Sequence, residues 1–86
     1  MNEPENIIVT VQTVDESFMR DMELPSELTV SEISKKLLEA LKSMPESEFS
    51  DWNECLLLCG NMILNSSDTL LNAGVFDGST ITVLEK

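Results

Sequence analysis

The chain is 86 residues long, which corresponds to one small domain with one modest core. Hydrophobic residues make up 42% of it, so it is expected to fold. Sixteen acidic residues against five basic ones give a formal net charge of −11, which repels nucleic-acid phosphates and anionic lipid headgroups. This charge argues against a nucleic-acid-binding protein. It either keeps the domain soluble or favours a partner with a basic patch.

The N-terminal residues 1–6 are acidic and polar and are expected to form a flexible leader, followed by one domain over residues 7–86. The leader has neither the basic region nor the apolar region of a signal peptide. The longest apolar stretch, residues 56–64, is too short and too interrupted to span a bilayer. A cytoplasmic protein without direct membrane insertion is therefore expected.

The first half of the domain begins with two expected strands. Residues 7–13 are rich in β-branched side chains, and residues 18–24 alternate between apolar and acidic ones. Residues 15–17 form a plausible turn between them, so a hairpin is predicted. Arg20 falls on the inner face of the second strand and is therefore expected near a sheet edge or a bulge.

A helix is expected next, from about residue 30 to residue 43. Residues 29–32, Thr-Val-Ser-Glu, form a capping box, and Pro45 stops the helix. One apolar stripe at helical spacing is assigned to the core, namely Val30, Ile33, Leu37, Ala40, Leu41 and Met44. Three cations lie off that stripe, namely Lys35, Lys36 and Lys42. They are interpreted as a solvated helix face, and the alternative is a site that orients an acidic partner segment.

Turn signals divide the rest of the chain. Three further strands are expected, over residues 54–59, 62–64 and 79–84. A short helical turn is expected over residues 69–72, capped by Ser67 or Asp68 and ended by Gly74. The polar segment before the third strand holds Trp52, interpreted either as a lid on the core or as an interface anchor.

This order of elements predicts an α+β protein: a mixed sheet of four to five strands packed on one amphipathic helix, with a short second helical turn. The string from Leu70 to Leu84 resembles the ending of ubiquitin-like β-grasp domains. The string from Leu56 to Gly60 is similar to the Leu-rich strand of ubiquitin that runs into a glycine turn. Thr29-Val30, with Ile33 and Leu37, matches the start of the ubiquitin helix, so the likeness spans residues 7–84.

Within that superfamily the sequence is most similar to the YukD/EsaB proteins, small bacterial ubiquitin-like proteins associated with WXG100 (type VII) secretion systems. The one-domain chain and the ending Leu-x-x-x-Gly-Val-x-x-Gly-x-x-Ile-x-Val-Leu carry this resemblance. It implies an accessory protein-binding role with a secretion component as partner. Conjugated and sulfur-carrying relatives end in Gly-Gly, whereas this sequence ends in Val-Leu-Glu-Lys, so neither of those activities is expected.

The third strand is apolar on both of its faces, which leaves its orientation open. By resemblance, Leu56 and Leu58 are assigned to the core and Leu57 to the outer face of the sheet, where ubiquitin carries its main recognition patch. A protein-binding patch is therefore predicted from Leu57 and Leu84, flanked by Cys55, Cys59 and Thr82. The alternative is that the leader or the Trp52 loop covers these residues.

Catalytic residues, metal ligands and cofactor-binding motifs are not predicted. The chain has no histidine, and its three glycines form no phosphate loop. Cys55 and Cys59 lie four residues apart on one strand, which is too far for a disulfide, and two thiols alone do not make a zinc site. The first candidate function is an accessory subunit of a secretion apparatus. The second is a ubiquitin-like structural subunit or adaptor of an unrelated assembly, in which the chain could form a homo-oligomer.

Overall fold

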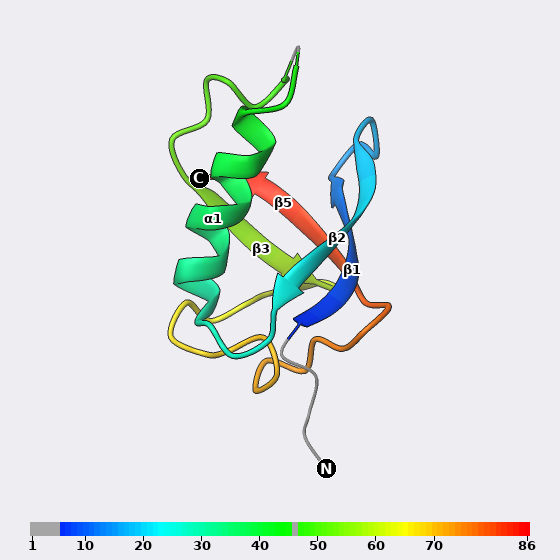
Figure 1. Ribbon diagram of the computed structural model, residues 1–86, viewed down its shortest axis with the longest axis vertical. Coiled ribbons are helices and arrows are strands. Elements are labelled where there is room, and N and C mark those ends of the chain that lie inside the picture. The colour runs from blue at the N-terminus through cyan, green and yellow to red at the C-terminus, as the bar shows by residue number, and fades with distance from the viewer. Residues whose placement is uncertain (1–5, 46) are drawn as a thin grey trace.

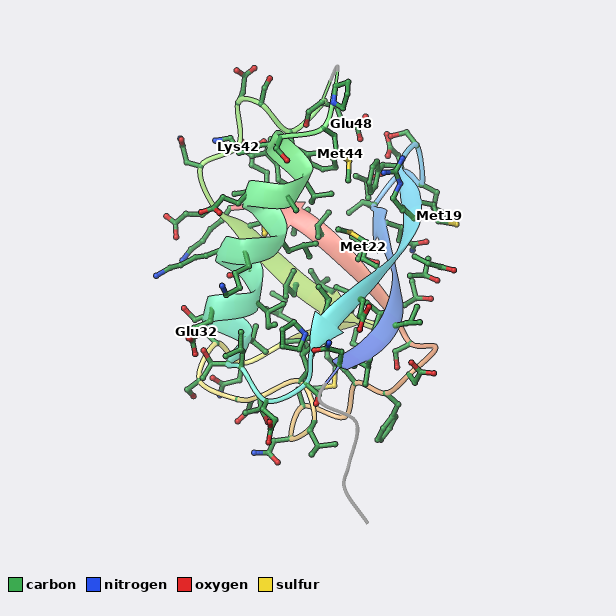
Figure 2. All side chains as sticks on the ribbon, viewed as in Figure 1. Met19, Met22, Glu32, Lys42, Met44 and Glu48 are labelled. Carbon is green, nitrogen blue, oxygen red and sulfur yellow. The ribbon has the colours of Figure 1, made fainter. Side chains whose placement is uncertain are left out.

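The predicted hairpin opens the fold. The computed structural model describes residues 6–45 and 47–86, so the predicted leader lies outside the described residues except for Asn6. Asn6 is already the first residue of β1 (Asn6–Thr13), which pairs antiparallel with β2 (Met19–Pro25). Figure 2 shows that β2 alternates as expected, because Met22 points into the space beside α1 (Val30–Lys42) and Met19 points away from it.

The turn between β1 and β2 is held by one carboxylate. Asp15 Oδ1 accepts hydrogen bonds from the Thr13 hydroxyl at 2.8 Å and from the Ser17 backbone N–H at 3.1 Å. The Ser17 hydroxyl donates a third at 2.9 Å. These donors, the Ser17 N–H foremost, lower the pKa of Asp15. Glu16 lies in the left-handed region at φ 59°, which lets the chain reverse within a few residues.

The capping box predicted for the helix is confirmed. The Glu32 backbone N–H donates to the Thr29 hydroxyl oxygen at 3.2 Å, and Glu32 Oε1 accepts from the Thr29 N–H at 3.4 Å. The helix ends at Lys42, with Ser43 as its C-cap, close to the predicted bound. Its buried side chains are Val30, Ile33, Leu37, Leu38 and Leu41. Leu38 was not on the predicted stripe, whereas Ala40 and Met44 are only half-buried.

The C-terminal strands complete one mixed sheet. β3 (Cys55–Cys59) pairs antiparallel with both β4 (Met62–Ile63) and β5 (Thr80–Glu85), and β5 runs parallel to β1. The strand order is β2-β1-β5-β3-β4, which places Arg20 on an edge strand as expected. Figure 1 shows α1 lying across one face of this sheet. The predicted α+β architecture, with five strands packed on one helix, is confirmed.

The predicted second helical turn is a chain of tight turns over residues 69–75. The Ala73 N–H donates to the Thr69 carbonyl at 2.9 Å, and the Val75 N–H donates to the Leu70 carbonyl at 3.0 Å. The cap is Thr69, whose hydroxyl oxygen accepts from the Asn72 N–H at 3.1 Å, rather than Ser67 or Asp68. Gly74 closes the turn at φ 84°, as expected.

An aromatic cluster closes the core at the C-terminal end of α1. Phe49 is buried, and its ring meets those of Phe18 and Trp52 edge to face, with centroids 5.2 Å and 4.9 Å away. The Lys42 ammonium donates to the Trp52 carbonyl at 2.7 Å, which fixes the loop to the helix. The sequence interpretation missed Phe49, because it stands alone in a polar segment with no periodic apolar neighbours.

Candidate protein-binding surface

The sheet has a second face, turned away from α1, which carries the exposed Ile8 and Met19 on β1 and β2 and a group of apolar side chains on β3, β4 and β5. We call four of them the outer-face patch, namely Leu56, Leu58, Ile63 and Leu84. Leu56 lies opposite Leu84, and Leu58 lies opposite Ile63, so the four are cross-strand or same-face neighbours. Ile63 is 59% exposed and Leu84 is 37% exposed, while Leu56 and Leu58 are half-buried.

The predicted orientation of β3 is wrong. Leu57 is only 1% exposed and Cys55 is buried, so both belong to the core rather than to the outer face. Cys59 shares their face and is half-buried against the core. The physical reason is the register of β3 on β5: Leu57 lies opposite the buried Val83, and opposed residues point to the same face of a sheet.

Two of the predicted surface residues do lie on the outer face. Leu84 is exposed, and Thr82 is half-buried and accepts a hydrogen bond from Gln12 Nε2 at 3.4 Å. Leu56 and Leu58, which were assigned to the core, take the places predicted for Leu57 and its flanking cysteines. The patch therefore keeps its position on the sheet but is built from the other side chains of β3.

Cys55 is a poor nucleophile in this setting. Its Sγ lies 3.5 Å from the Ser34 carbonyl oxygen, to which it donates, and burial raises the pKa of the Cys55 thiol to about 11. Both cysteines are free thiols. No group of three metal-ligating side chains occurs within residues 6–45 and 47–86.

The β1–β2 side of the outer face mixes acidic and apolar side chains, since Ile8 and Met19 are exposed there. At the β2 edge it carries Asp21, which accepts from the Thr10 hydroxyl at 2.8 Å, and Glu23, which accepts from the Asn6 amide at 2.9 Å. The outward positions of the five strands, within the described residues, hold no lysine or arginine. The lysines predicted to form a solvated face, Lys35, Lys36 and Lys42, are exposed on α1, which covers the opposite face of the sheet.

A cleft of about 450 Å³ adjoins the patch at the end of β5. Three segments supply its walls: the β1–β2 turn with Val14, the loop before β3 with Trp52, and the end of β5 with Leu84. Val14 is 64% exposed, and Trp52 is half-buried between the core and the cleft. The sequence gives little signal for this cleft, because its walls come from segments about 35 residues apart in the chain.

Within residues 6–45 and 47–86, no helix has the length and the apolar character needed to cross a membrane.

The fold is that of ubiquitin-like β-grasp proteins, as comparison with solved structures shows. Caldiarchaeum subterraneum ubiquitin matches with a TM-score of 0.68 at 20% identity, over 94% of each chain. The ubiquitin-like domain of the Mycobacterium tuberculosis type VII secretion protein ECCD1 matches with a TM-score of 0.68 at 23% identity, over 93% of this chain and 98% of that one.

A third match is a chain of the MycP5-free ESX-5 inner membrane complex, with a TM-score of 0.77 at 18% identity. It covers 96% of this chain but only 21% of that one. Identities this low show the fold alone. Residues 6–83 match the model of the YukD protein of the WXG100 protein secretion system (Wss), and the chain belongs to the YukD family. Comparison with curated protein sequences gives no significant match.

Proposed function

We propose that this protein is a non-catalytic, cytoplasmic binding module that docks on another component of a WXG100 secretion system through the outer face of its sheet. The observation that carries the proposal is the outer-face patch. Its leucines and isoleucine stay partly or largely exposed on a face that α1 does not cover. Contiguous exposed apolar side chains on a small domain often mark an interaction surface.

Folding alone does not account for these side chains. The core is already filled by the inner residues of the same strands, among them Leu57, Ile81 and Val83. Polar residues at the outward positions of β3 would therefore leave that core intact. The apolar identity of Leu56, Leu58 and Ile63 is better accounted for by a partner that covers them. Membership of the YukD family supports a secretion component as that partner.

The charge of the face supports a partner of opposite sign. Asp21 and Glu23 border the face on the β2 side, and the whole chain carries a net charge of −11. A basic partner surface would be steered toward such a face, and salt would slow its association. The raised pKa of the Cys55 thiol further favours binding over nucleophilic chemistry.

The proposal is tested by Leu84→Asp, with Leu71→Asp as a matched control. Leu71 is 42% exposed, close to the 37% of Leu84, but it lies on the turn after Thr69, away from the patch. Both variants are expected to stay folded, because neither side chain is in the core. Affinity capture from cells that express the secretion system should lose the secretion component with Leu84→Asp and keep it with Leu71→Asp. Equal capture by the two folded variants would contradict the proposed surface.

A further inference from the structure

We infer that the cleft beside the outer-face patch receives an arginine side chain of the partner. This inference rests on the proposed function and specifies the chemistry of the docking surface. The cleft shares Leu84 with the patch, so a partner that covers the patch reaches the mouth of the cleft as well. A side chain projecting from an apolar partner surface would enter it at that point.

Four apolar side chains line the cleft, beside the polar Thr13 and Ser17. Val14 comes from the β1–β2 turn, Trp52 from the loop before β3, and Val83 with Leu84 from β5. These segments are fixed independently. Asp15 holds the turn through three hydrogen bonds, and Lys42 and Phe49 hold Trp52. The cleft is therefore shaped before any partner arrives, which lowers the cost of ordering it on binding.

The lining of the cleft also includes three carboxylates, one from each of the three segments. They are Asp15, Glu48 and Glu85. Figure 2 shows Glu48 beyond the last turn of α1. The one ion pair of the described residues joins Lys86 to Glu54 at 3.8 Å, so none of the three carboxylates is paired with a described lysine or arginine.

Three cations lie near this region, and none of them is paired with a carboxylate of the cleft. The Lys42 ammonium donates to the Trp52 carbonyl at 2.7 Å, and Lys86 pairs with Glu54 at 3.8 Å. Arg20 shares a smaller neighbouring cleft with Glu48, but its Nη1 lies 3.9 Å from Met44 Sδ and its guanidinium lies 6.0 Å from the centre of the Phe18 ring. The carboxylates of the cleft are thus available to a cation of the partner.

A guanidinium fits this lining better than an ammonium. Its planar fork can donate to more than one carboxylate at once, and it stacks on aromatic rings such as that of Trp52. Its weaker hydration also lowers the cost of entering a cleft lined in part by apolar side chains. Its aliphatic stem would lie along Val14 and Leu84.

The test uses the full ¹⁵N-labelled chain and the acetylated, amidated tripeptide Leu-Arg-Leu. In NMR titrations the Trp52 indole N–H and the Leu84 amide should shift saturably. The tripeptide Leu-citrulline-Leu, which keeps the shape but lacks the charge, should bind at least about five-fold more weakly, as should Leu-Lys-Leu. Equal binding of the citrulline tripeptide, or saturable shifts only outside the cleft, would overturn the inference.

Charge-neutral variants supply the matched comparison. Glu48→Gln with Glu85→Gln should weaken the arginine tripeptide at least about five-fold. Glu27→Gln with Glu39→Gln removes the same two charges from exposed sites outside the cleft, and should change its affinity less than about two-fold. Equal weakening by both pairs would show a response to net charge alone and would contradict a site in the cleft.

Partner capture separates this inference from the proposed function. If Leu84→Asp loses the secretion component while Glu48→Gln with Glu85→Gln keeps it fully, the arginine inference fails and the docking surface stands. If Leu84→Asp captures normally while the tripeptide titrations behave as expected, the proposed docking surface fails and the arginine-binding cleft stands.

Discussion

At the scale of single residues, Leu57 and Leu58 show how one step along a strand separates folding from binding. They are neighbours with the same side chain, but Leu57 is packed in the core and Leu58 lies on the outer face. Because successive strand residues point to opposite faces, their environments differ although their chemistry does not. A substitution at Leu57 therefore reports on stability, and one at Leu58 reports on the surface.

Alanine at each position makes that difference measurable. Leu57→Ala should lower the free energy of unfolding by about 2–5 kcal/mol, because it opens a cavity in the core. Leu58→Ala should lower it by about 1 kcal/mol or less. Urea unfolding followed by Trp52 fluorescence measures both values. A larger loss for Leu58→Ala than for Leu57→Ala would mean that the strand faces the other way.

The two thiols should also differ. At pH 8 a thiol with a pKa of about 11 is ionised in only about one molecule in a thousand, so Cys55 should react slowly with Ellman's reagent in the native state. The variant Cys59→Ser leaves Cys55 as the single thiol, and its reaction rate should rise sharply once urea unfolds the chain. A native-state rate equal to that in urea would show that Cys55 is not buried.

At the scale of elements, the sequence predicted correctly those features that depend on neighbouring residues in the chain. The capping box at Thr29 and Glu32 fixed the start of α1, and Gly74 marked the end of a turn, because both depend on near neighbours. The orientation of β3 depends on its register with β5, a partner more than 20 residues away. A strand that is apolar on both faces carries no internal signal to choose between them.

The same limit explains what else the sequence interpretation missed. Phe49 is buried in the core through contacts that include Phe18 and Trp52, and the cleft is formed by three segments that are distant in the sequence. The apolar content of the patch was predictable from the composition of β3 and β5. The residues that form the patch were not predictable in the same way. Of the residues predicted for it, only Leu84 and Thr82 lie on the outer face.

The helix cap offers a prediction at this scale. Thr29→Ala removes the oxygen that accepts from the Glu32 N–H and should cost about 0.5–2 kcal/mol of stability. Thr29→Ser keeps the hydroxyl and should leave the stability nearly unchanged, because serine is at least as good an N-cap as threonine. Thermal or urea unfolding compares the two. If serine and alanine destabilise equally, the hydroxyl is not the stabilising group.

At the scale of the whole molecule, the charge of −11 is spread over a small domain, and residues 6–45 and 47–86 contain one ion pair. Such a surface repels itself as well as anionic partners. The carboxylates at the β2 edge and around the cleft add to a field that draws in cations near the outer face. The charge therefore opposes compactness and favours a basic partner.

Salt should reveal the self-repulsion. Raising NaCl from about 0.05 M to about 0.5 M shortens the Debye length from about 14 Å to about 4 Å and should raise the melting temperature. The variant Glu27→Gln with Glu39→Gln, which carries two fewer charges, should respond less. Differential scanning calorimetry provides the measurement. A melting temperature that falls with added NaCl would mean that attractive charge pairs dominate.

Site-specific photo-crosslinking can show whether the outer face of the sheet meets the secretion partner in the cell. Benzoylphenylalanine is placed at Ile63, in the outer-face patch, or at Lys36, exposed on α1 across the sheet. In cells that express the secretion system, we expect a crosslink to a secretion component from position 63 and none from position 36. A crosslink from position 36 alone, or from both positions equally, would contradict it.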